Sequence, residues 1–360
     1  MTPEDAFIAR PLQFNLARTA ALVGALAAIC LLALALSARL GEQSISLRAA
    51  LADPTSTDAA ILWSLRLPRA ILAVIVGAAL GTSGCALQAL TRNPLADPFV
   101  LGVSGGAALG ATVAIAAGLG TASQLAATPI HEALGRISAP SLFAFAGSLG
   151  ATALVFAGAR SGGQSSPYAA LLTGVIFNAF ASAAITCIKA LVMPDKLGEI
   201  LYWLAGTLGY ERGSTLAAAA LLQVVAIGVM WLCSGSLNLL TLGDDDAASL
   251  GVHVARTRLV LLLGASLSVA GAVALTGLIG FVGLIVPHVL RLWLGPDQRL
   301  LIPCSALGGA AFLTSSDLVA RLLFSLFHTE LPVGVITAIV GGPLFLVLLR
   351  RRELQRVEGL

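Results

Sequence analysis

"RLPRAILAVIVGAALGTSGCALQALTRNP", from Arg66 to Pro94, places one long apolar run between charged ends. Its apolar part, residues 68–90, is long enough to cross a bilayer as a helix, which takes about 20 residues. The remaining chain has the same character, because 58% of its 360 residues are hydrophobic, only 11% are charged and the mean hydropathy is +0.94. Soluble domains carry roughly 25% charged residues, so the sequence predicts an all-α polytopic membrane protein.

Turns and charges divide the chain into about ten candidate transmembrane helices. They cover residues 17–38, 68–90, 99–118, 139–159, 168–192, 214–233, 258–277, 278–293, 302–326 and 333–349. No polar block between them is long enough to fold alone, which predicts a single transmembrane domain over residues 1–360. The first segment follows Arg10 and Arg18 as in a secretory signal, but its length exceeds the roughly 7 to 15 apolar residues of a signal and favours a retained span.

The basic residues predict the orientation of these spans. An even number of spans places both termini on one side, and "LLRRRELQR" after the last span marks that side as cytoplasmic. With this orientation, twelve of the 21 basic residues lie inside and nine outside. The external segment 39–69 is the main exception to the rule, since it contains Arg39, Arg48, Arg66 and Arg69.

The 38 glycines follow a helical spacing in several spans. Gly77 and Gly81 are four residues apart, as are Gly102, Gly106 and Gly110, which predicts seams where helix backbones approach closely. "GAALGTSG" (77–84) and "GASLSVAG" (264–271) match at four positions in spans that run in opposite directions. This pattern indicates an inverted internal repeat of the kind found in transporters.

The sequence argues against several function classes. It has no P-loop, since neither Lys189 nor Lys196 follows a glycine, and it has no nucleophile elbow or H-E-x-x-H motif. We therefore expect that this chain is not an enzyme and binds no cofactor. Any ATP would be hydrolysed by a partner protein. The five cysteines are scattered through apolar runs and are expected to be reduced thiols. The chain has no basic stripe with interleaved aromatic residues, so nucleic acid is not an expected partner.

Asp317, in "TSSDLVARL", is the one acidic residue well inside a predicted span. Charges within the membrane are costly and usually functional. Arg321 lies one helical turn further on, so the two residues are expected to form an intramembrane ion pair. The alternative is a proton-coupled secondary transporter in which Asp317 carries the proton.

The predicted cytoplasmic loop 234–257 reads "SGSLNLLTLGDDDAASLGVHVART". A short helical stretch from Asp244 to Leu250 is flanked by glycines at both ends. Three acidic residues lie at its start, where the helix dipole favours them. Two interpretations remain open for this loop. It is either a solvated connector or a compact knob presented to a partner protein.

Four stretches resemble the FecCD/BtuC-like permease subunits of ABC importers for iron chelates, haem and cobalamin. They are "RLPRAILAVIVGAALGTSGCALQALTRNPLADPFVLGVSGGAALGA" (66–111), "LNLLTLGDDDAASLGV" (237–252), "GLIGFVGLIVPHVLR" (277–291) and "ELPVGVITAIVGGPLFLVLLRRR" (330–352). The resemblance covers nearly the whole chain. It implies the type II ABC importer permease fold with about ten transmembrane helices and an inverted repeat. It also implies a homodimer, two cytoplasmic ATPase subunits that bind ATP and magnesium, and a periplasmic substrate-binding protein.

The same resemblance implies roles for individual residues. Arg66, Arg69 and Arg321 correspond to positions that receive acidic side chains of the binding protein, and the alternative for Arg66 and Arg69 is snorkelling to lipid headgroups. Asn93, Leu95, Ser165 and Ser166 correspond to a cytoplasmic gate. The ATPase coupling helix corresponds to Leu242, Gly243, Asp244, Asp245, Asp246, Ala247, Ala248, Ser249, Leu250 and Gly251. Related permeases commonly carry arginine at the position of Ala248, and Arg256 could replace that contact.

The expected function is therefore transport of an iron complex, haem or a ferric siderophore, across the bacterial cytoplasmic (inner) membrane. The protein would be a multi-pass permease with both termini in the cytoplasm, driven by ATP hydrolysis in its partner. Cobalamin is the alternative substrate within the same family. A membrane scaffold without transport is a third class, which uptake measurements would separate from the other two.

Overall fold

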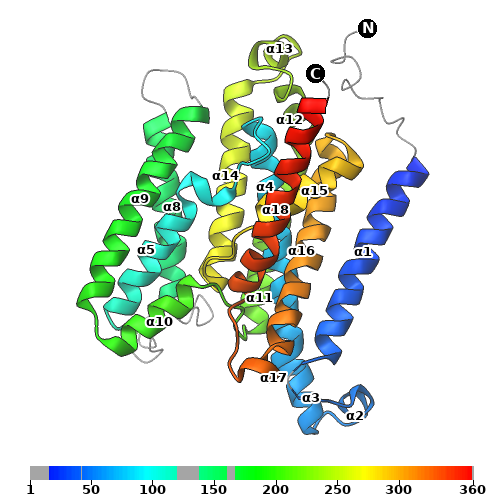
Figure 1. The fold of residues 1–360 in the computed structure, drawn as a ribbon, viewed down its shortest axis with the longest axis vertical. Helices are drawn as coiled ribbons and strands as arrows, with labels where there is room; N and C mark the ends of the chain where they lie inside the picture. The colour runs from blue at the N-terminus through cyan, green and yellow to red at the C-terminus, as the bar shows by residue number, and fades with distance from the viewer. Residues whose placement is uncertain (1–15, 42, 120–137, 160–166, 359–360) are drawn as a thin grey trace.

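The computed structural model describes residues 16–41, 43–119, 138–159 and 167–358, and all regular secondary structure in these residues is helical (Figure 1). Within these residues, seven helices are long and apolar enough to cross a membrane. They are α1 (Leu16–Arg39), α4 (Leu67–Leu90), α8 (Ala139–Ala159), α9 (Pro167–Leu191), α11 (Gly213–Leu232), α14 (Val254–Thr276) and α16 (Gln298–Leu322). Three helices with shorter apolar stretches occupy the other predicted positions: α5 (Val103–Ala116), α15 (Val282–Leu294) and α18 (Val333–Glu358), whose apolar part is Val333–Val347.

Short helices mark the two ends of this bundle (Figure 1). One end, called here the α13 end, carries α12 (Ser234–Leu240), α13 (Asp244–Ser249) and the last turns of α18. The opposite end, called the α17 end, carries α2 (Leu47–Ala52), α3 (Thr57–Ile61), α10 (Pro194–Leu204) and α17 (Phe324–Phe327). A π-helix, η1 (Leu62–Arg66), leads from α3 into α4, and a 3-10 helix, η2 (Pro98–Leu101), precedes α5.

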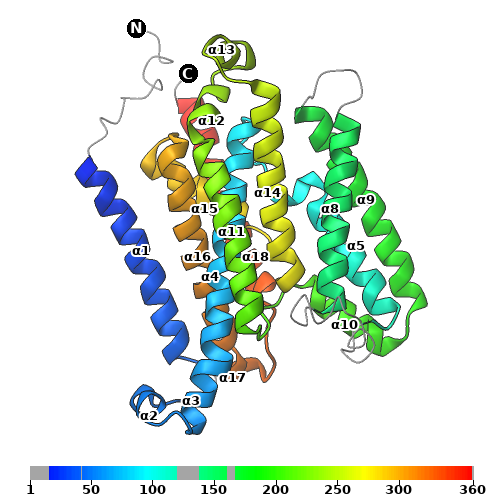
Figure 2. The same cartoon turned by 180° about the vertical axis from the view of Figure 1, so that it is seen from behind.

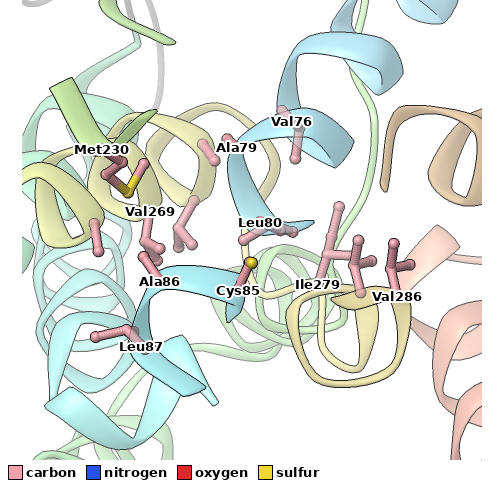
Figure 3. Packing of buried hydrophobic residues seen from close by; sticks show 14 of the residues in the cluster. Val76, Ala79, Leu80, Cys85, Ala86, Leu87, Met230, Val269, Ile279 and Val286 are labelled. Carbon is pink, nitrogen blue, oxygen red and sulfur yellow. The ribbon is translucent and has the colours of Figure 1, made fainter. Parts of the chain in front are cut away.

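Helix α4 forms the centre of the bundle. It packs against α16, α14, α15 and α11, and 18 of its 24 residues are buried. In Figure 3, Leu80 and Ala86 of α4 lie among Met230 of α11, Val269 of α14 and Val286 of α15. Helix α1 lies at one edge of the molecule, and α5, α8 and α9 form a group on the far side from it, as Figures 1 and 2 both show.

The predicted glycine seams are present at the helix crossings. A Cβ atom at Gly77 would lie 2.3 Å from the carbonyl oxygen of Gly309, and one at Gly84 would lie 1.8 Å from that of Gly283. On α5, a Cβ atom at Gly110 would lie 2.1 Å from the carbonyl oxygen of Phe143. These distances leave no room for a side chain, so glycine allows α4 to approach α16 and α15, and α5 to approach α8.

Two of the predicted spans have the wrong limits. The span predicted at 99–118 is divided, because Gly102 has a φ of +80° and separates η2 from α5. The span predicted at 278–293 begins later, at Val282, because Gly277 and Phe281 both adopt left-handed backbone conformations after α14. The backbone N–H of Thr207 donates to the carbonyl of Thr276 at 2.8 Å and holds this break against the segment that follows α10.

Candidate functional site

A group of five charged residues lies at the α17 end, and we call it the arginine cluster: Arg66, Arg69, Asp317, Arg321 and Glu330. Arg66 ends η1, Arg69 lies in the first turn of α4, Asp317 and Arg321 belong to α16, and Glu330 precedes α18. The three arginines are only 6%, 4% and 8% exposed, and Asp317 is fully buried. Burial of this much charge is stable only when the groups are paired.

Arg69 connects α4 to two carboxylates. Its Nε donates to Oδ1 of Asp317 at 2.9 Å, and its Nη1 donates to Oε1 of Glu330 at 2.6 Å. The guanidinium also lies 5.7 Å from the centre of the Tyr210 ring, a cation–π distance. Nε and Nη1 of Arg69 are therefore both engaged by carboxylates within the chain.

Asp317 is shared between two arginines. Its Oδ2 accepts from Nε of Arg321 at 3.0 Å, while its Oδ1 is bound to Arg69. Arg321 extends to α1, where its Nη1 donates to the carbonyl of Ser37 at 3.2 Å and its Nη2 donates to the Ser37 hydroxyl. The expected Asp317–Arg321 pair is thus part of a larger network that joins α1, α4 and α16.

Arg66 is the member of the cluster without a carboxylate partner among the described residues. Its guanidinium donates to the backbone carbonyls of Ala38, Arg39 and Gln43, with the Arg39 contact at 2.7 Å. Backbone carbonyls satisfy its N–H groups but do not neutralise its charge. The side chains of Arg66 and Arg69 are buried and hydrogen-bonded within the protein, which favours the docking prediction over snorkelling to lipid headgroups.

A pocket of about 180 Å³ opens beside these side chains. Its lining includes Arg66, Arg69, Arg321, Tyr210 and Glu330. With Asp317 behind them, three guanidinium groups have two carboxylates at ion-pair distance. Arg66 is the one without such a partner among the described residues, while the charge of Asp58 acts on it from beyond that distance. The pocket is therefore suited to one additional carboxylate, held in a bidentate arrangement by an arginine.

Tyr202 of α10 lies close enough to this pocket for the charges of Glu330 and Arg69 to act on its phenol. Burial raises the pKa of its phenol, and the charge of Glu330 raises it further. The Tyr202 hydroxyl therefore stays neutral and adds no negative charge to the pocket.

The predicted coupling segment, residues 242–251, forms a protruding turn around α13 at the α13 end, and we call it the knob (Figure 2). Ala247 anchors it as a fully buried side chain, while Leu242 and Leu250 are 65% and 60% exposed. Oδ1 of Asp244 accepts from Nη2 of Arg92 at 2.6 Å and from Nη2 of Arg258 at 2.7 Å. Asp244 is therefore engaged within the chain, whereas the knob presents apolar side chains to its surroundings.

The predicted gate residues Asn93 and Leu95 lie in the loop after α4, at the same end as the knob. Oδ1 of Asn93 accepts from the backbone N–H of Leu95 at 2.9 Å, which fixes a tight turn. Leu95 is 43% exposed. Ser165 and Ser166, the other two predicted gate residues, lie outside the described residues.

Arg92 joins this loop to the knob. Its backbone is left-handed, with a φ of +51°, and its Nε donates to the carbonyl of Leu240 in α12 at 2.9 Å. With the Asp244 ion pair, one side chain thus contacts both α12 and α13. A displacement of the knob would be transmitted directly to the residue that precedes Asn93.

Sequence reasoning did not identify Glu330 and Arg92 as partners of the predicted site residues. Each residue stands inside a motif that carries the family resemblance, at the end of a helix and next to a proline or a turn. An acidic residue at the mouth of a span, at the same end as an arginine, was the signal available for Glu330. Arg92 gave no such signal, because its partners lie 148 and 152 residues away in the sequence.

Comparisons with known proteins give a consistent result. A model of the FecCD transport family matches residues 25–351. The cobalamin import system permease protein BtuC of Halobacterium salinarum is 42% identical over 83% of this chain and 76% of its own length. The hemin transport system permease protein HmuU of Yersinia pestis is 39% identical over 91% of this chain and 95% of its own. A solved metal-chelate type ABC transporter in an inward-facing conformation superposes with a TM-score of 0.78 at 31% identity, covering 91% and 98% of the two chains.

Proposed function

This chain belongs to the FecCD transport family, and we propose that it imports an iron complex, haem or a ferric siderophore, across the bacterial cytoplasmic membrane. It is a multi-pass permease subunit rather than an enzyme. The match over residues 25–351 is the single observation that carries the proposal, because it includes the arginine cluster, the gate loop and the knob in one family pattern. The permease would act as one transmembrane domain with both termini in the cytoplasm.

The partners follow from the two ends of the bundle. Two copies of the chain would form a homodimer, two cytoplasmic ATPase subunits would bind ATP and magnesium and contact the knobs, and a periplasmic binding protein would dock at the α17 ends. The basic residues after α18 support this orientation, since positive charge favours the cytoplasmic side. The exposed Leu242 and Leu250 supply the apolar surface that an ATPase cleft would bury.

Arg92 would couple the ATPase to the gate. When ATP closes the two ATPase subunits, the knobs move with them, and the Arg92 contacts to Asp244 and Leu240 carry that motion to Asn93 and Leu95. The glycine seams of α4 would allow this helix to slide against α16 without a side chain in the way. Alternating access then needs only small displacements of rigid helices.

At the α17 end, docking would use Arg66 as the principal arginine. Arg69 and Arg321 already bind Asp317 and Glu330, so they have less capacity for a partner's carboxylate. Arg66 has no carboxylate at ion-pair distance among the described residues and lies beside the pocket. An acidic side chain of the binding protein would neutralise its charge.

Cobalamin is a second candidate substrate, favoured by the 42% identity to a cobalamin permease over 83% of this chain. The 39% identity to a hemin permease covers more of both proteins and favours the iron complex. The secondary transporter hypothesis is weaker. Asp317 has no exposed surface and each of its oxygens accepts from an arginine, so a proton carrier at this position would first have to break two ion pairs.

Uptake into vesicles tests the function directly. Vesicles would contain this permease and its ATPase, with the binding protein added outside and haem, a ferric siderophore or cobalamin offered in turn. We expect vanadate-sensitive uptake of an iron complex that requires all three proteins. Uptake that follows a proton gradient without ATP would refute the ABC mechanism, and uptake of cobalamin alone would reassign the substrate.

A further inference from the structure

A second pocket, of about 590 Å³, lies at the α13 end, away from the Arg92–Asp244 contact. The end of α11 and the start of α12 form one wall, with Cys233 and Gly235. The start of α14 forms another, with His253 and Arg256, and Arg299 of α16 closes the pocket. Leu250 and Gly251 of the knob also line this pocket, so it adjoins the surface proposed to contact the ATPase, and the sequence offered Arg256 as an ATPase contact. Neither the transport proposal nor the family resemblance gives the pocket a lipid ligand.

The pocket is positively charged. Arg256 and Arg299 line it, and no acidic side chain is among its lining residues. Neither arginine forms an ion pair with any described residue. The nearest acid to Arg299 along the chain, Asp297, lies beside the pocket. Its Oδ1 accepts from Nδ2 of the lining residue Asn238 at 2.7 Å and from the backbone N–H of Arg299 at 3.0 Å, and it forms no ion pair with the Arg299 guanidinium.

The Arg299 guanidinium lies over a bare stretch of backbone. A Cβ atom at Gly235 would lie 3.4 Å from its Nη2 and 3.8 Å from its Nε. The absence of a side chain at Gly235 therefore leaves the guanidinium accessible from the pocket. The backbone beneath Arg299 is fixed as well, since Nε1 of Trp231 donates to the Arg299 carbonyl at 3.0 Å.

The wall formed by α11 carries an exposed apolar face. Leu221, Val224, Val225 and Leu232 are 54% to 79% exposed and lie on one face of this helix. Trp231, 50% exposed, lies in the last turn of the same helix. Tryptophan at the end of an apolar transmembrane helix is typical of the headgroup layer, so the pocket lies at the depth of lipid phosphates.

We propose that this pocket binds the phosphate of an anionic phospholipid in the leaflet at the α13 end. Arg256 and Arg299 pair with the phosphate, while the acyl chains follow the apolar face of α11. Basic pockets between transmembrane helices on the cytoplasmic side are suited to such headgroups. The proposal depends on the membrane placement of the helices and not on the transported substrate.

Native mass spectrometry of the detergent-purified permease with added phosphatidylglycerol or phosphatidylcholine tests the proposal. We expect the wild-type chain to retain phosphatidylglycerol and the double variant R256Q/R299Q to bind it about thirtyfold more weakly, at about a factor of five for each arginine near a headgroup. Gly235→Leu keeps both charges but fills the space beside Arg299 and should also weaken binding. Arg48→Gln, an exposed arginine in α2 at the opposite end, is the matched control and should bind as wild type.

Four results would overturn the proposal. Equal phosphatidylglycerol binding by wild type and R256Q/R299Q would remove the pocket from lipid binding, and an equal loss of phosphatidylcholine would show that the arginines do not select anionic lipid. Displacement of the lipid by inorganic phosphate, with phosphate adducts in its place, would assign the pocket to a soluble anion. If R256Q/R299Q lost association with the ATPase while its lipid binding stayed unchanged, Arg256 would instead make the charged ATPase contact that Ala248 cannot provide.

Discussion

The arginine cluster and the knob each contain an aspartate that is shared between two arginines. The two aspartates differ in their exposure to solvent. At the α17 end, Asp317 is fully buried between Arg69 and Arg321. At the α13 end, Asp244 is 42% exposed and its partner Arg92 is 43% exposed. Similar distances, 2.6 to 3.0 Å, therefore describe interactions with different energetic consequences.

Solvent access explains the difference. Removing one partner of a buried ion pair leaves a charge without compensation and costs about 3 to 5 kcal/mol. An exposed pair contributes about 0 to 1 kcal/mol, because water and salt replace the lost partner. The α17 end is therefore a fixed frame, whereas the exposed contact between Arg92 and Asp244 at the α13 end can be exchanged at little cost. This difference fits the proposed docking at the first end and the proposed motion at the second.

The largest effect is expected for Asp317→Asn. This change leaves Arg321 without a carboxylate and removes one of the two partners of Arg69, so the free energy of unfolding should fall by about 3 to 5 kcal/mol. Thermal unfolding in detergent measures this loss. The double variant D317N/R321Q should be more stable than D317N, because it removes the charge that the single change leaves unpaired. Equal stability of the two variants would contradict the interpretation of the cluster as a buried frame.

Arg66→Gln should have the next largest effect, on docking rather than on the frame. Loss of a charged hydrogen bond to the binding protein's carboxylate is expected to cost about 1.5 to 3 kcal/mol, or about tenfold to a hundredfold in affinity. Surface plasmon resonance with the purified permease measures this change, and Arg48→Gln in α2 is the control. If docking is unchanged while thermal stability falls, Arg66 is only a clamp for the carbonyls of Ala38, Arg39 and Gln43.

Glu330→Gln should have a smaller effect of the opposite sign. Glu330 is 37% exposed and occupies Nη1 of Arg69, so it competes with any carboxylate that the binding protein brings. Its removal should strengthen docking several-fold and cost less than about 1 kcal/mol of stability. The same binding measurement decides, and weaker docking by E330Q would mean that Glu330 orients Arg69 rather than competing with the partner.

A smaller effect on stability than that of D317N is expected for Asp244→Asn. The exposed pair with Arg92 contributes about 0 to 1 kcal/mol, and the pair with Arg258, whose side chain is 12% exposed, adds to it. The substitution separates the knob from Arg92 and Arg258, so vesicle uptake should fall while the fold remains intact. Asp245→Asn, in the same turn of α13, is the matched control because it makes no ion pair among the described residues. A loss of stability comparable to that of D317N would remove the distinction between the two ends.

Most of the fold could be predicted from the sequence. Ten apolar segments and their approximate limits follow from hydropathy, because a bilayer requires long helices whose backbone hydrogen bonds are satisfied within each segment. The glycine spacing at Gly77 and Gly81 also predicted a seam. It did not identify α16 as the neighbour, nor did it predict the breaks at Gly102 and Gly277, since a left-handed glycine and a helical glycine are identical in sequence.

The candidate site was predicted less completely. Arg66 and Arg69 stand at the mouth of a predicted span and Arg321 lies within another, and the family resemblance implied the same role for all three. The structure separates them by their partners: two bind carboxylates and one binds only backbone carbonyls. The helical stretch predicted in the knob, from Asp244 to Leu250, ends one residue beyond the observed α13, Asp244–Ser249. This stretch was predictable because glycines and three consecutive acidic residues mark a short helix locally.

The sequence by itself therefore determined which segments span the membrane and which residues carry charge at each end, because hydropathy and charge are properties of local stretches of chain. Only the tertiary structure decided which charges neutralise one another. Arg69 meets Asp317 and Glu330 across 248 and 261 residues, and Arg92 meets Asp244 across 152. Such contacts depend on how helices pack and cross, and a single sequence records that packing only in its small residues.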